Sequence, residues 1–128
     1  MKKVIVTPGF DHYRRDWHFS PAIDTGEFVF LSGVTGTRTD DSVAADPETQ
    51  FRDAFQFLSA TLVQSGCTVG DLVDLTTYHV DLRRHLRVFM KVKDEFVVEP
   101  YPAWTAVGVA ELITDRALVE IRAIARRA

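Results

Sequence analysis

The 128-residue sequence has little cysteine, proline or glycine, and it lacks a long hydrophobic run. Its one cysteine, Cys67, excludes an internal disulfide and is typical of a reducing compartment. The apolar run near the N-terminus, Val4–Val6, stops after three residues, too early for a signal peptide. No later stretch approaches the ~20 apolar residues of a membrane span. We therefore expect a cytoplasmic protein without a membrane partner.

The sequence also has fewer basic than acidic residues. Fifteen Lys and Arg residues against 18 Asp and Glu residues give a net charge of −3 at pH 7, without the basic excess of a nucleic-acid binder. The four histidines are His12, His18, His79 and His85. They lack metal-ligand spacing, such as two histidines at i and i+4 on a helix. We expect no nucleic-acid partner and no metal site.

What the sequence does have is the balance of one ordinary globular domain. Hydrophobic residues make up 46% and charged residues 26% of the chain. A chain of 128 residues can bury a core of its own, and no linker or repeat interrupts it. We predict a single domain over residues 1–128.

Two helices are predicted. Asp46-Pro47-Glu48 is a strong helix start, with a capping carboxylate, a proline in the first turn and an acid near the positive end. An apolar stripe with helical spacing follows (Phe51, Phe55, Leu58, Leu62), and Gly66 ends the helix. A second helix is predicted over 84–97, before the prolines at 100 and 102, with these residues inward: Leu86, Phe89, Met90 and Phe96 or Val97.

The remaining segments predict strands and loops. Strands are expected over 3–6, 19–23, 28–32, 72–82, 102–109 and 119–125, and residues 10–18 are expected to form a loop. The order β-β-α-β-α-β-β, with a further short N-terminal strand, indicates an α+β two-layer sandwich: one mixed sheet with two helices on one face.

The last two strands carry two unusual features. One face of the first strand holds Trp104 and then small residues (Ala106, Gly108, Ala110), which leaves room for a helix, another chain or a ligand. In the second strand Glu120 stands in a mostly apolar run, where a carboxylate needs either a partner or a function.

Two helices cover only one face of a sheet, so the other face must be polar or buried by another copy. The apolar strand face formed by Val119, Ile121, Ala123 and Ala125 therefore predicts oligomerisation through the sheet.

Four places in the chain resemble the YjgF or Rid family, the reactive-intermediate (enamine/imine) deaminases: residues 19–22, 29–33, the helix 50–66, and 102–107 together with 119–125. The resemblance implies a chorismate-mutase-like fold of the bacillus type and a homotrimer with ligand clefts between subunits. It also implies hydrolytic deamination of a small enamine or imine without a cofactor.

The resemblance also implies a site. Glu120 matches the family's catalytic glutamate, and Gly33 and Ala106 match positions whose backbone N–H groups face the ligand. Trp104, followed by Thr105, stands where the family has an arginine that pairs with the substrate carboxylate; Phe19 stands where many members have tyrosine. An indole offers one N–H and no charge. Altered specificity is therefore implied, with Glu120 catalytic and a substrate-binding set of Phe19, Gly33, Trp104, Thr105 and Ala106.

Alternatives stay open for these residues. Glu120 is either an acid/base or a carboxylate paired with Arg122 or with an arginine across a subunit interface. Trp104 is either a wall for a flat ligand or interface packing. His18 is a weak candidate for the lost anchor, and His79 is interpreted as structural. For the whole protein, the alternative to an enzyme is a non-catalytic ligand-binding or protein-stabilising trimer.

Overall fold

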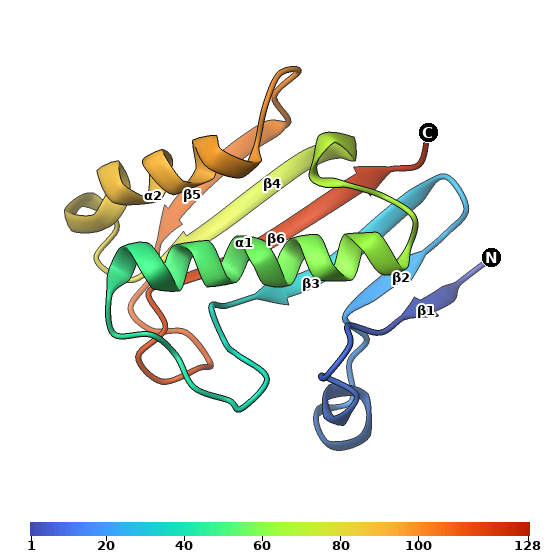
Figure 1. Cartoon of the computed structure of the whole chain (residues 1–128), viewed down its shortest axis with the longest axis horizontal. Coiled ribbons are helices and arrows are strands. Elements are labelled where there is room, and N and C mark those ends of the chain that lie inside the picture. The colour runs from blue at the N-terminus through green and yellow to red at the C-terminus, as the bar shows by residue number, and fades with distance from the viewer.

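A computed structural model describes all residues, 1–128, as one sheet with two helices packed on one face (Figure 1). The strands are β1 (Lys3–Ile5), β2 (Ala22–Asp24), β3 (Phe28–Val34), β4 (Leu72–His79), β5 (Ala103–Gly108) and β6 (Val119–Arg126). The helices are α1 (Pro47–Gln64) and α2 (Leu82–Phe96), with two short turns, η1 (Tyr13–Trp17) and η2 (Val69–Asp71). The predicted α+β class and element order are confirmed, including the short N-terminal strand.

The six strands lie in the order β1-β2-β3-β6-β4-β5. β4 and β5 are parallel, with α2 forming the crossover between them, and every other neighbouring pair is antiparallel. The C-terminal strand β6 therefore lies in the middle of the sheet, between β3 and β4, while β5 forms an edge. Both sides of β6 are hydrogen-bonded, which fixes the residues of that strand in place.

Helix α1 begins and ends where the sequence predicts. The side chain of Asp46 accepts a hydrogen bond from the Thr49 N–H at 3.0 Å, which satisfies one of the free donors at the helix start. Gly66 has a φ of +81° just after the helix, a left-handed conformation that glycine adopts without strain. The predicted apolar stripe is fully buried, and α1 packs on β3 and β6.

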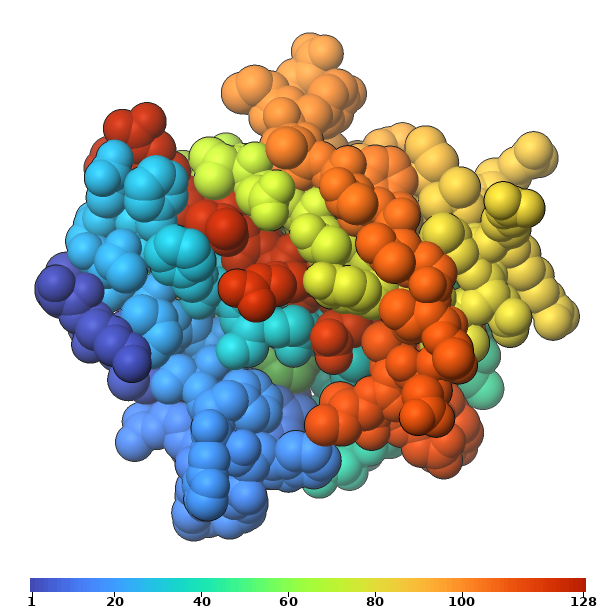
Figure 2. Space-filling model, turned by 180° about the vertical axis from the view of Figure 1, so that it is seen from behind, coloured from blue at the N-terminus to red at the C-terminus, as the bar shows by residue number.

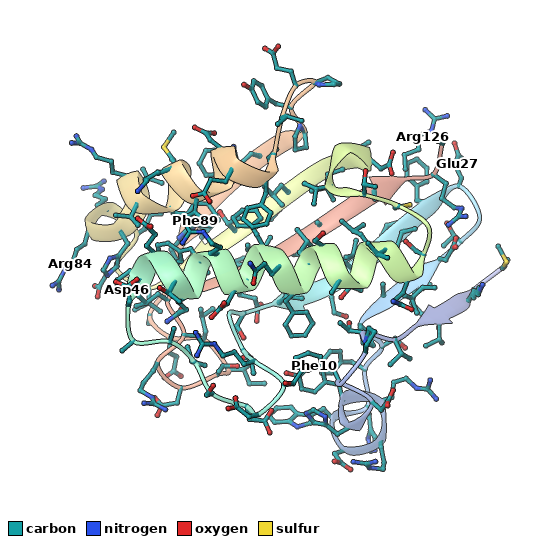
Figure 3. The ribbon with its side chains drawn as sticks, in the orientation of Figure 1. Phe10, Glu27, Asp46, Arg84, Phe89 and Arg126 are labelled. Carbon is teal, nitrogen blue, oxygen red and sulfur yellow. The ribbon has the colours of Figure 1, made fainter.

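The predicted inward face of helix α2 is confirmed in one part and wrong in another. Phe89 is fully buried between α2 and the sheet (Figure 3), and Val92 and Val97 are buried with it. Met90, predicted to point inward, is 42% exposed. One residue advances a helix by about 100°, so the position after Phe89 is turned toward solvent. Lys93, one turn after Phe89, takes the buried place instead.

The small-residue face of β5 is covered by α2. Trp104, Ala106 and Gly108 are paired with Leu75, Thr77 and His79 of β4, and these three β4 residues are buried on the helix side of the sheet. A Cβ added to Gly108 would lie 3.7 Å from the Cβ of Leu82, at the start of α2. Of the three occupants that the sequence allowed, the one present within this chain is a helix.

The apolar face of β6 is also turned toward the helices. Val119, Ile121, Ala123 and Ala125 are buried in the core, so inferring oligomerisation from these residues was wrong. The periodicity showed two faces correctly but could not tell which one the helices cover. The opposite face of the sheet is free of helices (Figure 2), and β6 presents on it Glu120, Arg122, Ile124 and Arg126.

Residues 10–18, predicted to form a loop, contain the turn η1 instead. Phe10 is buried, with its ring centroid 4.2 Å from that of Phe57 in α1. The rings of Tyr13 and Phe19 stack at 5.1 Å, and His18 closes the turn with a left-handed φ of 58°. Aromatic contacts over long sequence distances therefore hold this segment against the domain.

Candidate functional site

A pocket of about 310 Å³ opens between the N-terminal segment, the end of β3 and the connection that precedes β6. Seen from the uncovered side of the sheet, the N-terminal segment (blue) and that connection (orange to red) flank a hollow (Figure 2). Its lining consists of His12, Tyr13, Trp17, Phe19, Gly33, Val34, Thr35, Thr37, Asp41, Phe57, Ile113, Thr114 and Glu120. A volume of this size is at the lower end of small-molecule sites in proteins.

A β-bulge brings Gly33 against Glu120. The register between β3 and β6 shifts between Leu31 and Val34, so β3 carries one extra residue there. A Cβ on Gly33 would lie 2.7 Å from both Cδ and Oε2 of Glu120, closer than real Cβ contacts come. Glycine at position 33 therefore lets the Glu120 carboxylate lie flat against the backbone of β3 at the wall of the pocket.

The Glu120 carboxylate has no partner within the chain. It is half-buried, and it makes neither a hydrogen bond nor an ion pair; Arg122, two residues along the same strand face, does not contact it as a salt bridge. Burial, which penalises the charged form, raises the pKa of Glu120 above its ordinary value. A half-buried carboxyl group with a raised pKa at a pocket wall is a stronger base than an ordinary carboxylate, and it can accept and return a proton.

Aromatic rings form the other walls of the pocket. Tyr13 lies between Phe19, at 5.1 Å between ring centroids, and Phe57, whose ring is nearly parallel to it at 6.5 Å. Trp17, at the end of η1, is 56% exposed and extends this wall toward the mouth. A flat apolar ligand would find rings on several sides.

The titratable groups of the lining are two carboxylates, a phenol and an imidazole. His12 Nε2 lies 3.7 Å from Asp41 Oδ1, and the ring of His12 lies 4.6 Å from that of Tyr13. Burial, and then the nearby charge of Asp41, raise the pKa of the Tyr13 phenol, so Tyr13 stays neutral at physiological pH. No lysine or arginine lines the pocket.

Trp104 lies away from this pocket, on the helix side of the sheet. Its Nε1–H donates a hydrogen bond to Thr77 Oγ1 at 2.9 Å, and Lys93 Nζ lies 4.4 Å from the centre of its ring. Thr105 lies on the uncovered face of β5, and Ala106 shares the side of Trp104. One chain thus brings together Phe19, Gly33 and Glu120 in the pocket, but not Trp104, Thr105 or Ala106.

The same helix-side cluster contains His79. It is fully buried, with Nε2 at 2.8 Å from Thr77 Oγ1 and its ring edge-on to Phe89 at 4.6 Å, while Nδ1 has no partner. Burial, and to a lesser degree the charge of His85, lower the pKa of His79 to about 4. His79 is therefore neutral at pH 7 and remote from the pocket.

Gln50 in α1 holds the connection that forms one side of the pocket. Its Nε2 donates to the carbonyl oxygens of Ala44 at 3.0 Å and Arg116 at 3.2 Å, and its Oε1 accepts from the Leu118 N–H at 2.6 Å. The residue is 1% exposed, and all of these partners are backbone groups. One buried amide therefore joins two loops to the start of α1.

Sequence reasoning missed several of the pocket residues. Tyr13, Trp17 and Phe57 were not predicted as lining residues, nor was Asp41. Phe10, Tyr13 and Trp17 recur at three and four residues, which is helical spacing and was the available signal. No group of three or more His, Cys, Asp or Glu side chains is placed to hold a metal ion. Neither helix has both the length and the hydropathy needed to cross a lipid bilayer.

Comparisons with known proteins agree with this geometry. Residues 14–127 match the protein family described as Endoribonuclease L-PSP. The chain is 43% identical over 128 residues to the RutC family protein YjgH of Escherichia coli K12, covering 98% of this chain and 96% of that protein. It is 33% identical over 111 residues to the 2-iminobutanoate/2-iminopropanoate deaminase of Dermatophagoides farinae, covering 83% of each. The crystal structure of E. coli TdcF with bound serine superposes with a TM-score of 0.79 at 30% identity, over 86% of this chain and 88% of that one.

Proposed function

Because the chain belongs to the family described as Endoribonuclease L-PSP, which is the YjgF or Rid family, we propose that it is a small-metabolite hydrolase that converts an enamine or imine into a carbonyl compound and ammonia. A relative that covers 83% of the chain is named 2-iminobutanoate/2-iminopropanoate deaminase. The observation that supports the proposal most is the partnerless, half-buried carboxylate of Glu120 in a pocket large enough for a metabolite.

In this reaction Glu120 handles water and protons. Ionised Glu120 accepts a proton from a water molecule as the water oxygen bonds to the imine carbon, and the π electrons move to nitrogen. Glu120 then returns the proton to the nitrogen, which gives a carbinolamine. The remaining hydroxyl proton passes to nitrogen as the C–N bond breaks, so ammonia leaves and the carbonyl compound remains. Burial raises the pKa of Glu120, so its carboxylate is a stronger base than an ordinary one, which favours the first step. No step requires a cofactor.

We further propose a homotrimer with the ligand clefts between subunits. Trp104 and Ala106 lie on the opposite side of the sheet from Glu120, so they do not line the Glu120 pocket of their own chain. The uncovered sheet face, with Phe30 38% exposed and Val107 37% exposed, is the apolar surface available for contact with a neighbouring copy, and β5 presents Thr105 on it. Sedimentation equilibrium would test the assembly; a monomer would refute it.

The same arrangement supports altered substrate specificity. The one N–H of Trp104 is already bonded to Thr77, so this residue has neither a free donor nor a charge for a substrate carboxylate. We expect weak activity on small 2-imino acids and a preference for more apolar or aromatic imines. Turnover of small 2-imino acids comparable to that of a relative with arginine at the matching position would contradict this.

The experiment that tests the reaction measures ammonia release from imines formed in situ by an amino-acid oxidase, including the imine of phenylalanine. Glu120→Gln keeps the side-chain size and removes the acid/base function, so turnover should fall about 10²–10⁴-fold while the thermal midpoint stays close to that of the wild type. If Glu120→Gln and the wild type both show only background turnover and both bind ligand, the protein is a non-catalytic ligand-binding trimer instead.

A further inference from the structure

We propose that the pocket selects a substrate without a carboxylate, the protonated imine (iminium) of an arylalkylamine. For its chemistry this inference depends on the function proposed above, whereas the binding preference can be tested without turnover. It follows from the size of the pocket, its aromatic walls and the sign of the charges that line it.

Size and walls favour one aromatic ring with a short chain. A cavity of about 150 Å³ is enough to hold benzene, so about 310 Å³ accommodates a ring together with a two-carbon side chain. Tyr13, Trp17, Phe19 and Phe57 present rings to this space, which favours stacking with an aryl group. The same ring faces attract a cation placed over them.

The charges of the lining disfavour an anionic substrate. Two carboxylates, Asp41 and Glu120, belong to the lining, and the one group that can become positive, His12, already lies 3.7 Å from Asp41. Arg14 and Arg15, which follow the lining residue Tyr13, lie with Asp11 around a separate hollow. Arg38, which follows the lining residue Thr37, is paired with Asp53. A substrate carboxylate would lose its hydration and meet like charge without a counter-ion.

A cationic imine meets the opposite situation. Its N–H groups can donate to the ionised Glu120, which has no other partner, and its positive charge is balanced by the lining. Water adds to the imine carbon, the C=N π pair moves to nitrogen, and Glu120 takes one water proton and returns it to nitrogen. The C–N bond then breaks, and the remaining hydroxyl proton leaves with the nitrogen. Iminium plus water therefore gives an aldehyde plus ammonium.

Binding is tested on the assembled protein by isothermal titration calorimetry with two probes of similar shape and opposite charge, 2-phenylethylammonium and 3-phenylpropanoate. We expect the cation to bind at least about tenfold more tightly. Equal affinity, or tighter binding of the anion, would overturn the inference, because the charges of the lining would then not select a cation.

Asp41→Asn provides a sharper test of the charge argument. Asp41 has a positive φ of 67°, which asparagine tolerates as well as aspartate, so the turn is preserved while one charge is removed. The preference for the cation should fall several-fold. The control Asp94→Asn removes an exposed charge on α2 that forms no ion pair, and it should leave the preference unchanged.

Turnover separates the two proposals. The imine of 2-phenylethylamine, formed by an amine oxidase, and the imine of phenylalanine, formed by an amino-acid oxidase, differ only in the carboxylate. Faster ammonia release from the first supports both proposals. Faster release from the second refutes the specificity and leaves the hydrolytic function standing. Cation-selective binding with no turnover of either refutes the reaction and leaves the binding inference supported.

Discussion

Adding one methyl group at Gly33 is a direct test of how Glu120 is placed. The Cβ of a Gly33→Ala variant would lie 2.7 Å from Cδ and Oε2 of Glu120, whereas ordinary contacts begin at 3.4 Å. The carboxylate must therefore move by at least about 0.7 Å, and a displacement of about 1 Å in a catalytic group can cost about 10²-fold in rate. The φ of Gly33 is not positive, so the backbone itself accepts alanine.

We expect kcat/KM of Gly33→Ala for its best imine to fall about 10–100-fold, measured as ammonia release. A carboxylate displaced into the pocket is better hydrated, so we expect the pKa of Glu120 to drop toward its ordinary value. If ionised Glu120 is the reactive form, the rate rises as pH increases through this pKa, and the rising limb of the profile shifts to lower pH in the variant.

Gly70→Ala is the matched control. Gly70 lies in η2, far from the pocket, and the nearest atom to an added Cβ is Thr68 Oγ1 at an ordinary 3.4 Å. This variant should have wild-type activity and an unchanged pH profile. Wild-type kinetics for Gly33→Ala would refute the reasoning, because Glu120 could then be moved from its position against β3 without consequence.

Three further predictions concern polar side chains in the interior of the domain. The folded-state pKa of His79, about 4, lies below the ordinary 6.5, so its contribution to stability is present above pH 6.5 and is lost as pH falls toward 4. Between pH 7 and 4.5 the loss of unfolding free energy due to His79 amounts to about 2–3 kcal/mol. Urea unfolding of the wild type at fixed protein concentration should show this loss. An equal loss in His79→Gln would contradict its attribution to His79. Trp104→Phe removes the hydrogen bond to Thr77 and should cost about 1 kcal/mol in the free energy of unfolding; a thermal midpoint equal to that of the wild type would argue against it. Gln50→Leu leaves buried backbone groups of Arg116 and Leu118 without partners and should lower the free energy of unfolding by about 1–3 kcal/mol. Amide hydrogen exchange over residues 115–118 should become faster. Unchanged exchange there would show that other contacts hold the connection.

Local chemistry made most of the fold predictable from the sequence. The Asp46 cap, the stripe from Phe51 to Leu62 and the left-handed Gly66 each act within a few residues, and together they located α1 almost to the residue. The alternation in β6 likewise separated its two faces. Which of those faces the helices cover is decided by packing between distant elements, and periodicity within one strand carries no information about it.

The family resemblance identified part of the site, since Phe19, Gly33 and Glu120 all line the pocket. Glu120 and Gly33 were both singled out, yet their contact depends on a bulge of one residue in β3 that the sequence does not signal. Tyr13 and Trp17 were missed because η1 is held by contacts with Phe19 and Phe57, which are local only in space. Trp104 was assigned to the same site by resemblance, although within one chain it lies on the other side of the sheet.

The hydrogen bonds of Gln50 separate the stability of the domain from the shape of its pocket. They fix the connection before β6 at Arg116 and Leu118, whereas Ile113, which lines the pocket, is 73% exposed and is not held by that amide. Residues 110–114 can therefore vary in length and chemistry while the core stays intact. Laboratory evolution aimed at new substrates should concentrate its diversity in this short stretch, since changes there alter one rim of the pocket without disturbing the fold that carries Glu120.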